Sequence, residues 1–130
     1  MQEQRKDISA AADYARSKAN SKSVGLCAKY VANALEHVGF KFNRQPSAYM
    51  YHTNGILSNL GFNSIAGGSP KKGDIYVEDK TQTHKDGHIA IYDGSNWVSD
   101  FVQKSSHVHS KDSGTNYYYR YWKNLHLITW

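Results

Sequence analysis

The residue best suited to covalent chemistry is Cys27, the single cysteine of the chain. It opens a segment whose apolar residues recur at helical spacing, so we expect it in the first turn of a helix. Helix N-termini present unpaired N–H groups and partial positive charge, which favour a thiolate and a developing oxyanion. We therefore predict a nucleophilic Cys27 with a lowered pKa, and the backbone N–H groups of Leu26 and Cys27 as oxyanion donors. A buried core cysteine is the alternative interpretation.

The histidine best placed to activate such a thiol is His88, one of seven in the chain. It follows Gly87 and opens the run Ile89-Ala90-Ile91-Tyr92, which is rich in strand-forming residues. We expect His88 to begin a strand and face a cleft, while Ile89 and Ile91 fill the other face of the sheet. A solvated surface histidine is the alternative.

Asp100 completes a candidate triad, because a catalytic imidazole needs an acceptor on its second nitrogen. A three-residue loop over residues 94–96 would set Asp100 opposite Ala90 and diagonally across from His88. A loop of two or four residues without a bulge would turn Asp100 to the other face. The predicted triad therefore requires an odd loop or a bulge.

The elements that must position these side chains change character once along the chain. Helices are expected first and antiparallel strands after them, which is typical of an α+β fold. We expect helices over residues 4–19, from an N-cap at Ser23 to a stop at Gly39, and from Pro46 to Gly61 with a weak point at Asn54-Gly55. Strands are expected over residues 74–78, 88–92, 97–102 and 117–122.

Composition narrows the class of protein. A chain of 130 residues with 39% apolar residues predicts one domain with its own core. It contains no apolar run long enough for a membrane span, and we expect no signal peptide because the charged N-terminus lacks an apolar region after it. A single cysteine excludes an internal disulfide framework.

The net charge of +5 fits an ordinary basic surface as well as an anionic polymer partner, either nucleic acid or bacterial cell wall. The basic residues are scattered, with no cluster on one element, which argues against nucleic acid. Bacterial cell wall remains as the polymer alternative to an ordinary basic surface, and we expect a monomer.

Four segments, in this order, resemble the papain-like cell-wall hydrolases of the CHAP and NlpC/P60 type. They are Gly25–Val31, Lys72–Val77, Gly87–Gly94 and Trp97–Phe101, within residues 20–103. The resemblance implies a cysteine that opens a helix packed on an antiparallel sheet, a histidine that begins a strand, and a third polar residue on the next strand. The third residue in these families is commonly His, Glu or Asn, where this chain has Asp100. The upstream oxyanion tyrosine of the family has only Tyr14 as a candidate.

The resemblance further implies one catalytic domain over residues 1–130 that hydrolyses amide bonds in peptidoglycan without cofactor or metal. The bond would be that between N-acetylmuramic acid and L-alanine, or one within the peptides. We expect substrate contacts from Tyr49, His52, Asp86 and Gly87. A chain without a signal peptide suits a phage lysis protein, or a toxin injected into the periplasm of a target bacterium. Such a toxin implies an immunity protein in the producer.

Three alternatives remain open at this point. A zinc hydrolase would use His84 and His88, or His107 and His109, although a four-residue spacing suits zinc on a helix and the first pair lies in an expected loop. A non-catalytic wall-binding module would use the aromatic residues 117–122 and Trp130. A papain-like deamidase, transglutaminase or acyltransferase would keep the same triad and act on another substrate.

Overall fold

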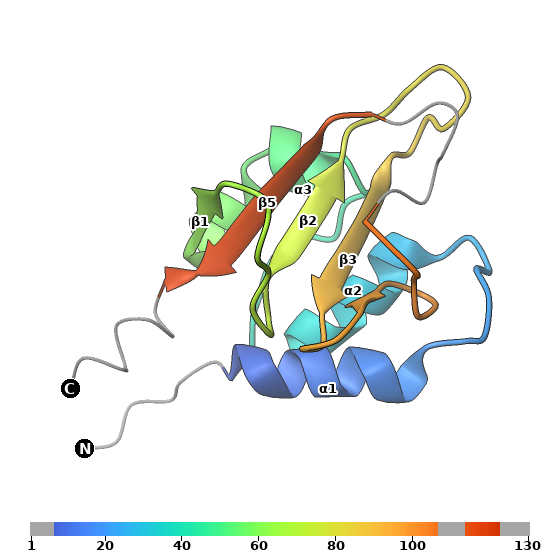
Figure 1. Cartoon of the computed structure of the whole chain (residues 1–130). Coiled ribbons are helices and arrows are strands. Elements are labelled where there is room, and N and C mark those ends of the chain that lie inside the picture. The colour runs from blue at the N-terminus through green and yellow to red at the C-terminus, as the bar shows by residue number, and fades with distance from the viewer. Residues whose placement is uncertain (1–6, 107–113, 123–130) are drawn as a thin grey trace.

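The computed structural model describes residues 7–106 and 114–122. Within these residues all four helices precede the five strands, in the order that the sequence predicts (Figure 1). The helices are α1 (Ile8–Lys18), α2 (Cys27–His37), α3 (Met50–Thr53) and α4 (Ile56–Leu60). The strands are β1 (Phe62–Ile65), β2 (Ile75–Glu78), β3 (His88–Tyr92), β4 (Trp97–Val98) and β5 (Asn116–Tyr121). The predicted metal pair His107 and His109, and Trp130, lie outside the described residues.

The five strands form one antiparallel sheet in the order β1-β5-β2-β3-β4, which confirms the α+β expectation. The main core lies between this sheet and the helices, with α1 packed on α2 and α2 packed on β3. Alternation along the strands decides which side chains enter it, since successive residues face opposite sides. Ile75, Val77, Ile89 and Ile91 face the helices, whereas Tyr76, Ala90 and Trp97 form a second cluster on the other face.

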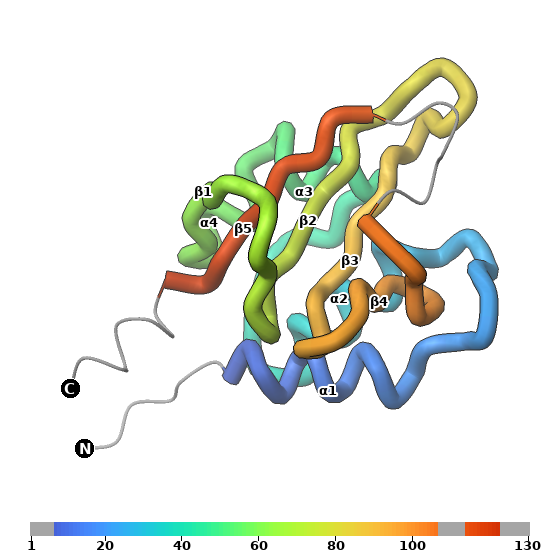
Figure 2. The backbone as a smooth tube through the Cα atoms, viewed as in Figure 1, coloured from blue at the N-terminus to red at the C-terminus, as the bar shows by residue number. Residues whose placement is uncertain are grey.

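The backbone path brings the start of α2 to β3 although some sixty residues separate them in the sequence (Figure 2). The helix starts there because Leu26 serves as N-cap and the N–H of Tyr30 makes the first helical hydrogen bond, to the carbonyl of Leu26. The predicted N-cap at Ser23 is therefore wrong by three residues. The hydroxyl of Ser23 instead donates to the carboxylate of Asp100.

Three further expectations are corrected by the structure. The segment after Pro46 forms two short helices, because Gly55 adopts a φ of 71° between them and breaks the helical hydrogen bonding. Strand β1 has no counterpart among the predicted strands, and it forms because β5 pairs with it along its whole length. Strand β4 covers only two residues of the predicted 97–102.

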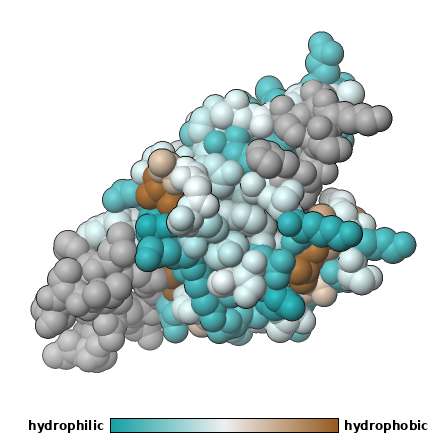
Figure 3. Space-filling model, viewed as in Figure 1, coloured by the Kyte–Doolittle hydropathy of each residue, from teal (hydrophilic) through white to brown (hydrophobic). Residues whose placement is uncertain are grey.

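The surface seen in Figure 3 is mostly hydrophilic, with small hydrophobic areas. Among the described residues, Val24 and Leu26 are the large hydrophobic side chains that are exposed. Leu26 directly precedes Cys27, and Val24 lies three residues before it. No described helix has the length and apolar character needed to cross a bilayer.

Gly87 fixes the position of His88, and its replacement is expected to be costly. Its φ is +68°, and a Cβ there would lie 2.2 Å from the carbonyl oxygen of Glu78. We expect Gly87→Ala to lower the free energy of unfolding by at least about 2 kcal/mol, because the backbone of two adjacent strands must separate. Urea denaturation measures this. Gly68→Ala is the control, because its φ of +120° is also unfavourable for alanine but no atom lies within 4 Å of the added Cβ. An equal loss of stability in both variants would contradict the clash at Gly87.

Candidate active site

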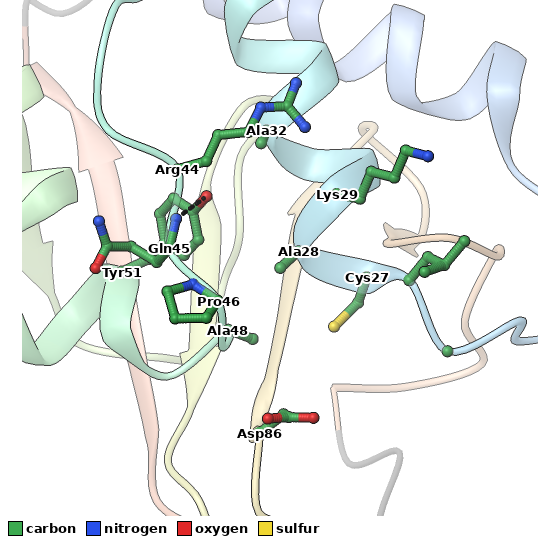
Figure 4. Close-up of a pocket in the computed structure, with 12 residues that line it drawn as sticks. Cys27, Ala28, Lys29, Ala32, Arg44, Gln45, Pro46, Ala48, Tyr51 and Asp86 are labelled. Carbon is green, nitrogen blue, oxygen red and sulfur yellow. Dashed lines mark hydrogen bonds between the residues drawn. The ribbon is translucent and has the colours of Figure 1, made fainter.

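Cys27 and His88 line the same cavity, of 300 Å³. A second cavity of 340 Å³ shares Gly25, Cys27 and Asp86 with the first, so the two form one groove that passes Cys27. Figure 4 shows the sulfur of Cys27 directed away from α2, into the space bordered by Ala28, Ala48 and Asp86. The groove thus brings the two predicted chemical groups together, from the start of α2 and the start of β3.

The contact between Cys27 and β3 is made through the backbone. The N–H of Ile89, the residue after His88, donates to the thiol of Cys27. The side chain of Cys27 is half-buried. The sulfur therefore sits against the backbone of Ile89, the second residue of β3.

The pKa of Cys27 is raised to about 11, which corrects the expectation of a lowered pKa. Burial is the largest cause, and the negative charges of Asp100 and Asp86 raise the pKa further, while the N–H groups of Ile89 and Ala28 lower it. Burial and two carboxylates outweigh the helix N-terminus, because removing an anion from water costs more than a terminal helix dipole returns. The resting sulfur is a thiol, and a base must take its proton.

Gln103, and not Asp100, is the side chain that forms a hydrogen bond with His88. Its Oε1 lies 2.8 Å from Nε2 of His88. Its Nε2 donates to the hydroxyl of Tyr76 at 2.9 Å and to the carbonyl of Ser105 at 3.0 Å, which orients the amide with its oxygen toward the imidazole. Nε2 of His88 is then the protonated nitrogen, and Nδ1 carries the lone pair. Both side chains are buried.

The turn between β3 and β4 explains why Gln103 and not Asp100 occupies this place. Tyr92 pairs with Trp97, and the N–H of Asp93 bonds to the carbonyl of Asn96, so the loop has two residues and not three. The chain then reverses over residues 99–101, where the N–H of Ser99 donates to the carbonyl of Phe101. Val102 pairs back with Val98, and the N–H of Gln103 donates to Trp97. The sequence offered no spacing signal for this reversal.

Asp100 lies within the reversal and turns toward the start of α2. Its Oδ2 accepts from the N–H of Val24 at 2.7 Å and of Leu26 at 3.2 Å. The predicted Cys27–His88–Asp100 triad is therefore corrected in its third member. The Leu26 amide is also corrected as an oxyanion donor, because its N–H is directed at Asp100.

The predicted substrate-contacting residues separate into two groups. Asp86 and Gly87 line the groove, and Asp86 borders both cavities. Tyr49 is absent from the groove lining; its backbone N–H binds the carbonyl of Asp86, and its ring lies under the ammonium of Lys80. His52 is also away from the groove, because its ring stacks on Tyr117 of β5.

The structure also gives the positions of the remaining candidates that lie within its described residues. Tyr14, the candidate oxyanion tyrosine, stacks on His37 at the far end of α2 from Cys27. Within the described ranges, no three His, Cys, Asp or Glu side chains are arranged to hold a metal ion. His84 lines the groove with His88.

The site and fold define an α+β protein with one groove that holds a helix-start cysteine and a strand-start histidine. No protein-family model matches the chain, and no curated protein does. Two solved structures of the type VI effector–immunity complex Tae3–Tai3 from Ralstonia pickettii do match. The native complex has 40% identity and a TM-score of 0.75, over 88% of this chain and 98% of that chain. The selenomethionine complex has 39% identity and a TM-score of 0.77, over 85% of this chain and 99% of that one. The chain belongs to the Tae3 family of type VI effectors.

Proposed function

We propose that this protein is a papain-like cysteine hydrolase that cleaves an amide bond in bacterial peptidoglycan. The observation that carries the proposal is the groove lined by both Cys27 and His88, with the amide of Ile89 on the sulfur. Membership of an effector family supports an antibacterial role. The net charge of +5 suits binding to an anionic wall polymer.

The reaction proceeds by acyl transfer. His88 takes the proton of the Cys27 thiol, and the sulfur attacks the carbonyl carbon of the scissile amide. The backbone N–H of Cys27 stabilises the oxyanion that forms, since the first N–H groups of a helix have no acceptor within the helix. The imidazolium gives its proton to the leaving amine, and the acyl group stays on sulfur. His88 then removes a proton from water, which hydrolyses the thioester and regenerates the thiol.

Gln103 acts as a positioning residue in this scheme. Its amide oxygen accepts from Nε2–H of His88, which leaves Nδ1 as the base. The same bond stabilises the imidazolium formed when the thiol loses its proton. No charge is needed on the third residue, because a neutral amide oxygen fixes both the tautomer and the orientation.

Gln103→Leu is expected to lower the rate of peptidoglycan digestion at least about tenfold, because the imidazole loses its fixed tautomer. Gln103→Glu retains an acceptor toward Nε2 and is expected to keep more activity. The release of soluble muropeptides measures both rates. Wild-type digestion by the leucine variant would remove Gln103 from the scheme.

The partners follow from the family. We propose that the protein is made in the cytoplasm, delivered to the periplasm of a target bacterium, and neutralised in the producer by a cognate immunity protein, since the related effector was solved in complex with its own. The bond cleaved is that between N-acetylmuramic acid and L-alanine, or a peptide bond in the stem or crosslink. The whole chain, residues 1–130, serves as one catalytic domain.

The test is digestion of purified peptidoglycan by the wild-type protein, with the products identified by mass spectrometry. A new free amino group, together with the mass of each fragment, identifies the bond that was cut. Absence of any cleavage by folded protein would contradict the wall substrate. It would favour a deamidase or acyltransferase reaction of the same cysteine on another molecule.

A further inference from the structure

We propose that Asp100 is a positioning residue. It binds the backbone of residues 23–26, which directly precede Cys27, and so sets the direction in which the sulfur points into the groove. The inference rests on the proposed role of Cys27 as nucleophile. Asp100 is fully buried and belongs to the reversal after β4, far from Cys27 in sequence.

This contact consists of one carboxylate oxygen and three donors. Oδ2 of Asp100 accepts from the N–H of Val24 at 2.7 Å, the N–H of Leu26 at 3.2 Å and the hydroxyl of Ser23 at 3.3 Å. The N–H groups of Val24 and Leu26 converge on one oxygen because Gly25 between them adopts a φ of +78°. Successive N–H groups around a left-handed residue form a concave site for an anion. Here the anion is a side chain of the protein itself.

A second set of bonds holds the same turn to the same segment. The carbonyl of Asp100 accepts from the backbone N–H and from the side-chain amide of Asn20, both at 2.9 Å. Asn20 also forms an isolated bridge with Phe101. The segment before α2 is thereby fixed at two points, residue 20 and residues 23–26. Cys27 directly follows the second point.

The carboxylate remains charged in this position. Burial alone would raise the pKa of Asp100, but the N–H groups of Val24 and Leu26 outweigh it, and the pKa lies below its ordinary value. The negative charge of Asp100 repels a thiolate at Cys27 and thereby contributes to the raised pKa of the thiol. Asp100 therefore has two separable effects, one through hydrogen bonds to the backbone and one through its charge.

The two effects are tested by two substitutions. Asp100→Asn keeps an oxygen that accepts from the Val24 and Leu26 amides but removes the charge, whereas Asp100→Ala removes both. Asp93→Ala is the matched control, because Asp93 caps the preceding turn through the N–H groups of Ser95 and Asn96. All variants retain the other titratable groups of the groove. Besides Cys27 itself, these are Lys29, Arg44, Tyr51, His84, Lys85, Asp86 and His88.

The first measurement is the rate of Cys27 alkylation by iodoacetamide as a function of pH. Both Asp100 variants are expected to shift the rise of this rate to lower pH, because a negative charge near the thiol has been removed. Asp93→Ala is expected to keep the wild-type profile, although it lowers the melting temperature. An unshifted profile in both Asp100 variants would overturn the electrostatic part of the proposal. The assay needs no wall substrate, so it remains informative if peptidoglycan proves not to be cleaved.

The second measurement is the digestion of purified peptidoglycan, with kcat and KM obtained from initial rates. Asp100→Ala is expected to lower kcat at least about tenfold with little change in KM, because a misplaced sulfur affects attack more than binding. Asp100→Asn is expected to recover most of kcat. Equal kcat in Asp100→Ala and wild type would overturn the positioning role, and so would an asparagine variant as impaired as the folded alanine variant.

Discussion

Replacing Cys27 with alanine is expected to abolish peptidoglycan digestion and leave the fold intact. In the proposed mechanism the sulfur forms the covalent bond to the acyl group, so we expect its removal to lower the digestion rate at least about a thousandfold. The side chain is half-buried at the first residue of α2, and alanine is a good helix former, so the melting temperature should change little. The muropeptides released from purified sacculi, separated and weighed by mass spectrometry, measure the effect.

Cys27→Ser is the companion variant for this experiment. It keeps a small polar atom in the same place, but a hydroxyl is a much weaker nucleophile than a thiol under the same base. We expect it to be inactive as well. Digestion by either variant at the wild-type rate, in protein whose circular dichroism shows it folded, would exclude the sulfur as nucleophile.

Replacing His88 with glutamine is expected to remove activity to a similar extent and to change how Cys27 reacts with pH. With a thiol pKa of about 11, thiolate at pH 7 is on the order of one part in ten thousand. Because the pKa is raised, the reactive thiolate is a small fraction of Cys27 at any pH well below 11. The alkylation rate of His88→Gln should therefore rise about tenfold per pH unit towards pH 11. In the wild type the thiol has the same raised pKa, but His88 takes the proton as the sulfur attacks, so the alkylation rate near neutral pH should exceed that of His88→Gln.

The control for this prediction is His52→Gln. His52 bonds to the hydroxyl of Tyr119 and stacks on Tyr117, away from the groove lining. Its replacement should leave both the alkylation profile and the digestion rate near those of the wild type. Matching profiles in His88→Gln and the wild type would show that His88 is not the base for Cys27.

The raised pKa of Cys27 has a consequence for a delivered effector. A sulfur held as a thiol reacts slowly with oxidants and electrophiles, because the thiolate is the reactive form. We therefore expect Asp86 and Asp100, which raise the pKa of Cys27, to slow its oxidation when no substrate is bound. In the proposed mechanism, full nucleophilicity then depends on His88 and on the substrate that fills the groove.

Local pattern was sufficient to predict the parts of the site that each lie on one element. The apolar stripe of α2 predicted a helix beginning near Cys27, and the strand-forming run after Gly87 predicted β3 with the bounds that the structure has. Helical and strand periodicities are properties of a few consecutive residues, so they can be read without knowledge of the fold. Asp86 and Gly87, which directly precede β3, line the groove, and their contact with substrate stays a prediction.

The third member of the site depended on contacts that no local pattern encodes. A two-residue loop and an immediate reversal after β4 carry Gln103 to His88 and send Asp100 to the loop before α2. One residue of difference in a hairpin loop exchanges the two faces of a strand. The loop length is decided by how β4 pairs with β3 and how residues 99–101 pack.

The electrostatics of Cys27 were likewise decided by tertiary structure. The sequence placed the sulfur at a helix start, which by itself favours a thiolate. Folding buried it and brought Asp86 and Asp100 near it from two distant segments. Sequence alone thus determined which residues have the chemistry, because side-chain type is local. The tertiary structure decided their partners and protonation, because burial and charge proximity are sums over the whole fold.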